Sequence, residues 1–283
     1  MTRVLICGAG SYIGTHIAAH LARFPQTYQV AELNVQKPFS AGDFAGWDVV
    51  VHVAGIAHQR ETPENAPLYA QVNRDLALNA ARLAKQQGVR QFLFFSSMSV
   101  YGLTHGHITA QTQPAPVTHY GQSKWQAEQA LCALQSDGFQ VAVLRPPMVY
   151  GRGCRGNYPR LAALACSLPF FPQVKNERSM LYIDTLCAFV RRLIESGRGG
   201  LFFPQNQAYV CTSDMAKQIA LCHGKKLRLV PGFGWLVNLL ARRVGTVDKL
   251  FGSLTYDRAL SIDFADEPQM DFAATIRQTE VGV

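Results

Sequence analysis

The sequence predicts an α/β protein with a doubly wound parallel sheet and a smaller C-terminal lobe. In the first half of the chain, short apolar runs alternate with stretches of helical period, a pattern typical of β-α-β units with parallel strands. A glycine run, 8-GAGSYIG-14, directly follows the first apolar run and opens the first helical stretch. Beyond residue 147 the alternation fails, and residues 147–180 are rich in Gly, Pro, Asn and Arg, which indicates loops around a pocket.

The individual elements follow from the same periods. Short apolar runs predict strands, and longer stretches of helical period predict helices; Asn73 lies near the start of one helix and Gly88 stops it. In chain order, we expect strand 4–7, helix 14–24, strands 28–33 and 47–55, helix 72–88, strand 91–97, helix 120–135, strand 139–146, helix 183–196, strand 200–204 and helix 212–223. We therefore predict one domain at residues 1–150 and a smaller lobe at residues 151–283, which can lend one strand to the sheet.

Composition restricts the class of protein. The chain has 283 residues, of which 48% are hydrophobic and 16% charged, so it is expected to form a sizeable globular core. The net charge of +8 comes from dispersed basic residues, which favours a small anionic ligand over nucleic acid. Seven cysteines without a C-x-x-C pair indicate reduced thiols, and the histidine spacing predicts no metal site.

Two observations bear on location. The first apolar run is too short for a signal peptide, so the sequence predicts a cytoplasmic protein. No apolar run approaches the roughly 20 residues of a membrane span. The apolar segment 233–245 carries two arginines near its end. Weak contact with a membrane is one interpretation of this segment, and a packed helix of the C-terminal lobe is the favoured one.

The glycine run predicts a dinucleotide site in a Rossmann-type domain. Glycines allow the backbone to turn tightly and to approach a pyrophosphate, whose charge meets free N–H groups at the helix N-terminus. A strand-to-helix turn without a ligand is the alternative. An acidic residue about 20 positions further on usually binds the adenosine ribose, and here Glu32 and Asn34 occupy that region, so NAD and NADP both stay open. The predicted cofactor residues of this part are Gly8, Gly10, Ser11, Tyr12, Ile13, Gly14 and Asn34.

Tyr120 and Lys124 lie four positions apart in 119-HYGQSKWQAE-128 and therefore share one face of a helix. A free tyrosine has a pKa near 10, and a neighbouring cation favours its phenolate, which could then exchange a proton with a hydroxyl group. Alone, such a pair is more often an exposed surface pair. The stretch 96-SSMSVYG-102 changes this interpretation because it places Ser97 at the end of a predicted parallel strand, where catalytic groups gather.

These two stretches, with VHVAG (51–55), QVN (71–73), LRPPMVYG (144–151) and ERSMLYID (177–184), resemble the extended short-chain dehydrogenase/reductase family. The resemblance is to its NAD-dependent epimerase/dehydratase type, which includes UDP-galactose 4-epimerases, and it runs in register from Val4 to about Tyr256. It implies Ser97 as the catalytic serine, Tyr120 as the acid/base and Lys124 as its ribose-binding partner. It further implies cofactor contacts at Val53, Ala54, Gly55, Asn73, Tyr120, Lys124 and Pro147.

For the substrate, the resemblance implies that Arg178 binds the diphosphate of a nucleotide sugar. It also implies that Ser97, Tyr150 and Asn157 line the substrate pocket. Asn73 could also be a plain helix cap, and Arg178 a surface charge. The sequence departs from the family pattern in two places. Ser11 stands where a glycine is usual, and only about 14 residues separate Gly14 from the strand at residue 28, so the adenosine end of the site is abbreviated.

The resemblance leads to a nucleotide-sugar 4-epimerase that acts on a UDP-hexose with bound NAD, in surface polysaccharide synthesis. A 4-keto-sugar reductase that consumes NADH or NADPH is the alternative, because the same three catalytic residues serve both reactions. A dinucleotide-binding module that senses redox state is the non-enzymatic alternative. Likeness to the family also predicts a homodimer.

Overall fold

A computed structural model describes residues 1–57, 59, 61–232, 248, 250–261 and 270–282. The segment 233–245, for which the sequence predicts a packed helix, lies outside the described residues. None of the helices described is long and apolar enough to cross a membrane.

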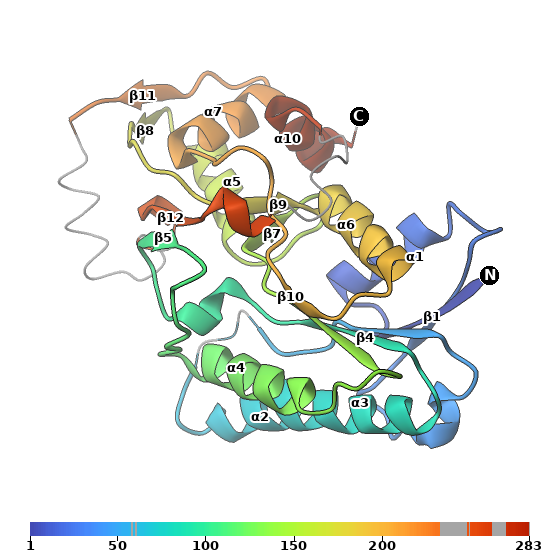
Figure 1. Cartoon of the computed structure of the whole chain (residues 1–283). Helices are drawn as coiled ribbons and strands as arrows, with labels where there is room; N and C mark the ends of the chain where they lie inside the picture. Colours follow the sequence, from blue (N-terminus) through green and yellow to red (C-terminus); the bar gives the residue numbers. More distant parts are fainter. Residues whose placement is uncertain (58, 60, 233–247, 249, 262–269, 283) are drawn as a thin grey trace.

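A six-stranded parallel sheet forms the centre of the molecule (Figure 1), which confirms the predicted fold class. The strand order is β10-β6-β4-β3-β1-β2. The strand of this sheet that comes last in the sequence, β10, lies beyond residue 151 and pairs with β6. The C-terminal part of the chain thus lends one strand to the sheet, as the sequence predicts. The division into two domains stays a prediction. The strands are β1 (Thr2–Cys7), β2 (Tyr28–Leu33), β3 (Val49–His52), β4 (Gln91–Phe95), β6 (Gln140–Leu144) and β10 (Gly200–Phe202).

Helices cover both faces of this sheet. Along β1, Val4 and Ile6 belong to a buried cluster with α1 (Tyr12–Leu21) and α6 (Ile183–Ser196). The alternate residues Leu5 and Cys7 belong to a second buried cluster, which packs under α3 (Leu76–Gln86) and α4 (His119–Cys132). These two helices lie together along the lower side of Figure 1. Because both faces are buried, the strands read as continuous apolar runs rather than as alternating ones.

One helical run differs from the prediction. The helix expected at 72–88 begins earlier, as α2 (Ala66–Ala70), and passes through a π-helical turn, Gln71–Asp75, into α3. Pro67 is tolerated because it lies in the first turn of α2. The start of this helix is not apparent in the sequence because the helical period of apolar residues begins only after it. Asn73 therefore lies inside a helical run and is not a helix cap.

The sheet ends at β2, beyond which no strand of the described chain pairs. The connection from β2 to β3 contains only a short 3-10 turn, η1 (Ala41–Phe44). This is the edge at which the sequence predicts an abbreviated adenosine end.

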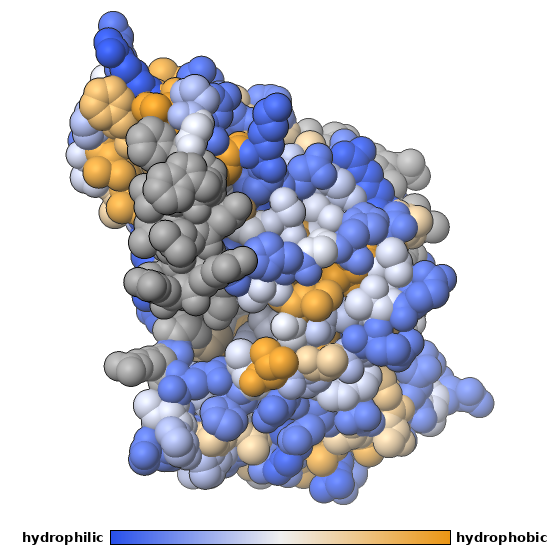
Figure 2. Space-filling model, turned by 90° about the vertical axis from the view of Figure 1, so that its left-hand side faces the viewer, coloured by the Kyte–Doolittle hydropathy of each residue, from blue (hydrophilic) through white to orange (hydrophobic). Residues whose placement is uncertain are grey.

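The second half of the chain packs helices against short strand pairs. The predicted loop region 147–180 contains α5 (Asn157–Ser167), two short strands and the first residue of a third. Propensity alone does not reveal these strands because each is only three residues long. Figure 2 shows the side of the molecule on which β5 and β12 lie, where hydrophobic residues form small groups among hydrophilic ones. The elements are β7 (Met148–Tyr150) with β9 (Met180–Tyr182), β8 (Phe170–Pro172) with β11 (Arg228–Val230), β5 (Gly106–Ile108) with β12 (Leu254–Tyr256), and the helices α7 (Thr212–Cys222) and α10 (Phe272–Val281).

Candidate active site

The glycine run forms a tight turn between β1 and α1. Gly8 has a φ of 126°, and a Cβ atom placed on it would come within 2.9 Å of the backbone nitrogen of Ala54. A side chain at position 8 would therefore push apart the loop and the segment after β3. Val53 and Ala54 both donate their backbone N–H to the carbonyl oxygen of Cys7, at 3.0 Å each. The structure thus brings the glycine run and Val53–Ala54 together.

Ser11 fills the usual glycine position without blocking the loop. Its Oγ accepts a hydrogen bond from the N–H of Gly14 at 3.2 Å and caps α1. In the described part of the chain, the N–H groups of Tyr12 and Ile13 donate to no protein acceptor. Two free donors at a helix N-terminus are what an anionic diphosphate requires.

The two polar residues at the end of β2 have different environments. The carboxylate of Glu32 accepts a hydrogen bond from the N–H of Gly10 at 3.0 Å and so lies beside the glycine run. Asn34 is exposed and uses its Oδ1 to accept the N–H of Gln36 at 3.0 Å, in a local turn. Glu32 is therefore the better placed of the two to meet a ribose hydroxyl, and the sequence prediction chose Asn34.

Asn73 is buried in the π-helical turn and holds the segment after β3. Its Oδ1 accepts from the N–H of Ile56 at 2.9 Å, and its Nδ2 donates to the carbonyl oxygen of Ile56 at 3.2 Å and to Ser123 Oγ at 3.0 Å. A Cβ atom on Gly55 would lie 2.7 Å from Asn73 Oδ1 and 3.2 Å from Lys124 Nζ. Gly55, Asn73 and Lys124 thus meet at one point, which is the placement expected for the nicotinamide ribose.

Tyr120 and Ser97 meet at the carboxyl end of β4. Ser97 ends the strand and starts η3 (Met98–Tyr101), where its Oγ accepts the N–H of Ser99 at 3.1 Å. Tyr120 lies in the first turn of α4. Burial raises the pKa of its phenol above 10, and the nearby Ser97 side chain opposes that rise. The two side chains can therefore share a hydroxyl group of a substrate.

Lys124 lies one turn further along α4. Its Nζ donates to the carbonyl oxygen of Phe95 at 2.7 Å and sits 4.7 Å from the centre of the Phe94 ring. Burial lowers the pKa of Lys124 to about 7, and the charge of Glu128 opposes that change. In the protein alone, the ammonium and the phenolate are thus both disfavoured by burial.

Behind these residues lies a buried ion pair that the sequence predictions do not include. Arg145 Nη2 donates to Glu128 Oε2 at 2.6 Å, and Nη1 donates to the hydroxyl of Tyr101 at 2.7 Å. Glu128 also accepts from Ser96, the neighbour of Ser97. Glu128 lies four positions after Lys124 on the same helix face, and this spacing is the one signal in the sequence that could have revealed it.

Arg178 belongs to the second half of the chain. Its Nη1 donates to the carbonyl oxygen of Gly252, while its Nε is buried and has no hydrogen-bond partner among the residues that the structure describes. Burial lowers the pKa of the guanidinium, and Asp248 opposes this. An incompletely bonded, partly buried guanidinium is suited to bind an anion.

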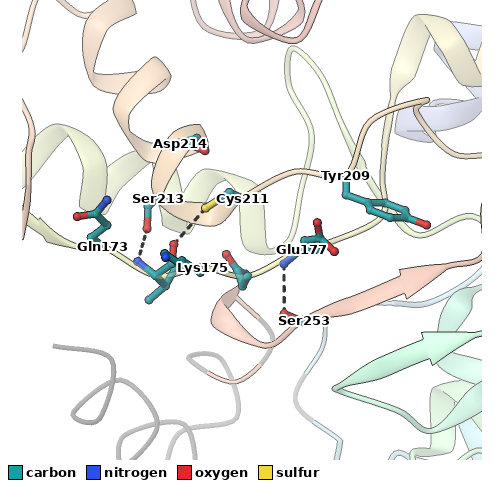
Figure 3. Close-up of a pocket in the computed structure, with 10 residues that line it drawn as sticks. Gln173, Lys175, Glu177, Tyr209, Cys211, Ser213, Asp214 and Ser253 are labelled. Atoms are coloured by element: carbon teal, nitrogen blue, oxygen red, sulfur yellow. Dashed lines mark hydrogen bonds between the residues drawn. The ribbon is translucent and has the colours of Figure 1, made fainter. Parts of the chain in front are cut away.

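An open pocket with a volume of about 560 Å³ adjoins the residue before Arg178 (Figure 3). At the start of α7, Ser213 Oγ accepts the N–H of Val174 at 2.9 Å, and on the other side Ser253 Oγ accepts the N–H of Glu177 at 3.2 Å. Lys175 and Asp214 give the pocket charges of both signs. Ser97, Tyr120 and Lys124 are not among its lining residues.

Three further residues that the sequence predicts as substrate or cofactor contacts are Tyr150, Asn157 and Pro147. Tyr150 is fully buried, and its hydroxyl lies 2.8 Å from Thr275 Oγ1 and accepts from Asn206 Nδ2 at 3.2 Å. This burial favours a role in the core rather than contact with a substrate. Asn157 is the first residue of α5, and Pro147 is buried between β6 and β7.

Known proteins resemble this chain in sequence and in fold. The model of the NAD dependent epimerase/dehydratase family matches residues 4–202. A UDP-glucose 4-epimerase from Vibrio cholerae is 31% identical over 244 residues, which cover 81% of this chain and 74% of that protein. A UDP-2-acetamido-2,6-beta-L-arabino-hexul-4-ose reductase from Pseudomonas aeruginosa is 27% identical, over 64% of this chain and 46% of its own length. The crystal structure of UDP-glucuronic acid 4-epimerase from Bacillus cereus with NAD has a TM-score of 0.76 at 17% identity and covers 99% of this chain and 95% of that one.

Proposed function

Because this chain belongs to the NAD dependent epimerase/dehydratase family, we propose that it is a nucleotide-sugar 4-epimerase that acts on a UDP-hexose. It is an enzyme of the extended short-chain dehydrogenase/reductase type. The relative from V. cholerae, a UDP-glucose 4-epimerase, supports the substrate and the reaction. We assign the product to the synthesis of a surface polysaccharide.

The residues present fit NAD. The free N–H groups of Tyr12 and Ile13 would hold the diphosphate, and the carboxylate of Glu32 would accept from a ribose hydroxyl. The same carboxylate would repel a 2′-phosphate, which favours NAD over NADP. Gly55, Asn73 and Lys124 would surround the ribose at the other end.

The observation that carries the proposal is the meeting point of Gly55, Asn73 and Lys124, with Tyr120 one turn before Lys124 on α4 and Ser97 at the end of β4 beside it. Tyr120 takes the proton from the C4 hydroxyl, and Ser97 holds the C4 oxygen in place. Bound NAD would supply the acceptor for the C4 hydride, and its positive ring would favour the phenolate. After the 4-keto sugar has turned, the hydride would return to the opposite face of C4, and Tyr120 gives the proton back to the C4 oxygen.

Arg178 would bind the substrate diphosphate. Its Nε lacks a hydrogen-bond partner in the described part of the chain, and burial lowers its pKa; both observations indicate that an anion would stabilise this side chain. Asn157 stays a predicted substrate contact, and Tyr150 is not part of the proposal.

The relative from P. aeruginosa favours a 4-keto-sugar reductase as the second candidate, because that protein is a reductase of a 4-keto nucleotide sugar. A redox-sensing module would not require Ser97, Tyr120 and Lys124 together, so the presence of all three favours an enzyme. A homodimer and a cytoplasmic location stay predictions.

Turnover distinguishes the two enzymes. We expect the purified protein to interconvert UDP-glucose and UDP-galactose, or their N-acetylated counterparts, without added reduced cofactor, and mass spectrometry to find NAD retained. Consumption of one NADH or NADPH for each 4-keto sugar reduced, without epimerisation, would establish the reductase instead.

Tyr120→Phe tests the assignment of the acid/base. Loss of its hydroxyl should lower kcat by about 10²–10⁴-fold while retained NAD and the fold stay unchanged. Tyr28→Phe is the matched control, because Tyr28 donates to Glu195 at 2.8 Å on the outer strand β2. Full activity of Tyr120→Phe would contradict the proposed mechanism.

A further inference from the structure

The N-terminus of α4 is capped by a residue from a distant segment. Thr118 Oγ1 accepts the N–H of Gly121 at 3.0 Å, which is an ordinary cap. The carboxylate of Glu61 accepts the N–H groups of His119 at 2.8 Å and of Tyr120 at 3.1 Å, one with each oxygen. The first turn of α4 contains no acidic residue of its own, so Glu61 supplies the negative charge that a helix N-terminus favours.

The segment that carries Glu61 is anchored on both sides. It follows Gly55, and Asn73 holds Ile56 through both its N–H and its carbonyl group. After Glu61, Asn65 Oδ1 accepts the N–H of Thr62 at 2.9 Å, and α2 begins. Glu61 is half-buried between these anchors, so its carboxylate is held at the helix end rather than free in solvent.

The contact joins two parts of the proposed site. One of the two N–H groups bound by Glu61 belongs to Tyr120 itself. The other end of the segment is Gly55, whose backbone lies against Asn73 and Lys124. A shift of Glu61 would therefore move the backbone of Tyr120 relative to the ribose-binding residues.

We propose that Glu61 is a positioning residue, which fixes the backbone of Tyr120 by capping α4 and ties that helix to the segment after Gly55. This role rests on the proposed function, in which Tyr120 exchanges the proton. Glu61 does not touch the reacting atoms, so its loss should affect the geometry of the reacting pair rather than substrate binding. A misplacement of about 1 Å at such a pair can cost up to about 10²-fold in rate.

Kinetics test the positioning. We expect Glu61→Ala to lower kcat about tenfold or more while KM for the UDP-hexose changes less than about threefold. Glu61→Gln keeps one oxygen that can accept an N–H and should recover part of the lost kcat, and it serves as the second variant if Glu61→Ala folds poorly. Glu64→Gln, on an exposed side chain of the same segment, should keep the wild-type kcat. Asp271 caps α10 through its carboxylate, which accepts the N–H of Ala273 at 3.0 Å. Asp271→Ala therefore controls for the loss of a helix cap elsewhere in the protein.

Hydrogen exchange of the peptide containing His119 and Tyr120 gives a readout that does not depend on the reaction. Exchange should become faster in Glu61→Ala and stay unchanged in Glu64→Gln. Unchanged exchange in Glu61→Ala would overturn the cap. Faster exchange with wild-type kcat would overturn the positioning role and leave the proposed function intact, whereas absence of epimerase activity in the wild-type protein would overturn the proposed function alone.

Discussion

The two ends of the proposed cofactor groove are built differently. At the catalytic end, Asn73, Lys124 and Glu128 are buried, and each makes hydrogen bonds to groups on other elements. At the adenosine end, Glu32 on the edge strand and Asn34 just after it are exposed, and the sheet has no described strand beyond β2. Proton and hydride transfer require fixed geometry, whereas the adenosine needs only an acceptor at the right place. The cofactor groove can therefore tolerate a shortened sheet edge at its adenosine end but not at its catalytic end.

The largest expected effect is on the buried pair at the catalytic end. Glu128→Ala leaves Arg145 buried without its carboxylate partner and should lower the free energy of unfolding by about 3–5 kcal/mol. Denaturant unfolding measures this, with Glu32→Ala as the control at the adenosine end, where less than about 0.5 kcal/mol is expected. Equal losses in the two variants would remove the contrast between the two ends.

Lys124 provides the next largest effect, as a pH dependence. Its pKa is about 7 in the folded protein and near 10.4 when unfolded, so the unfolded chain binds more protons between these values. Lys124 therefore destabilises the fold most below pH 7, and this cost disappears as the pH rises to about 10. We expect the stability of Lys124→Met relative to the wild type to fall across that window, measured by the difference in Tm without cofactor. A difference that is constant with pH would show that Lys124 keeps an ordinary pKa.

A smaller effect is expected at Glu32. Replacing it with alanine removes a charge that would repel a 2′-phosphate, so the ratio of the Kd values for NADPH and NADH should fall about tenfold, or about 1.4 kcal/mol. Fluorescence titration of both cofactors measures the ratio. Asn34→Ala should leave it unchanged, because that side chain bonds its own turn. A shift in Asn34→Ala instead would return the ribose contact to the residue predicted from the sequence.

The smallest effect is expected at Ser11. Since its hydroxyl caps Gly14, Ser11→Gly should cost only a few tenths of a kcal/mol in stability. The Kd for NADH, from the same titration, should stay within about threefold of the wild-type value. Tenfold tighter binding by the glycine variant would mean that the serine obstructs the diphosphate.

Features with a local signal could be predicted from the sequence. The glycine run by itself predicts a tight turn between a strand and a helix. The spacing of four residues predicts that Tyr120 and Lys124 lie on the same helix face. The alternation of apolar runs and helical periods predicts the parallel sheet, because both faces of each strand are buried.

Contacts between distant segments could not be predicted in this way. Glu61 reaches α4 across 58 positions of sequence, and nothing in its own neighbourhood indicates that partner. Tyr150 lies in a motif shared with the family, yet its exposure depends on the packing of α10 and Asn206 around it. Propensity describes a segment, whereas these features depend on which segments meet.

The π-helical turn at Gln71–Asp75 has a consequence for how the chain tolerates insertions and deletions. A turn of this kind contains one residue more than an α-helical turn, and each residue rotates a helix by about 100°. Deleting one residue there would restore a regular helix and swing α2, with the buried Tyr69, away from its present side. Ala77, Ala80 and Ala84 would keep their place under the sheet. We therefore expect the length of this turn to be far less tolerant of change than its composition.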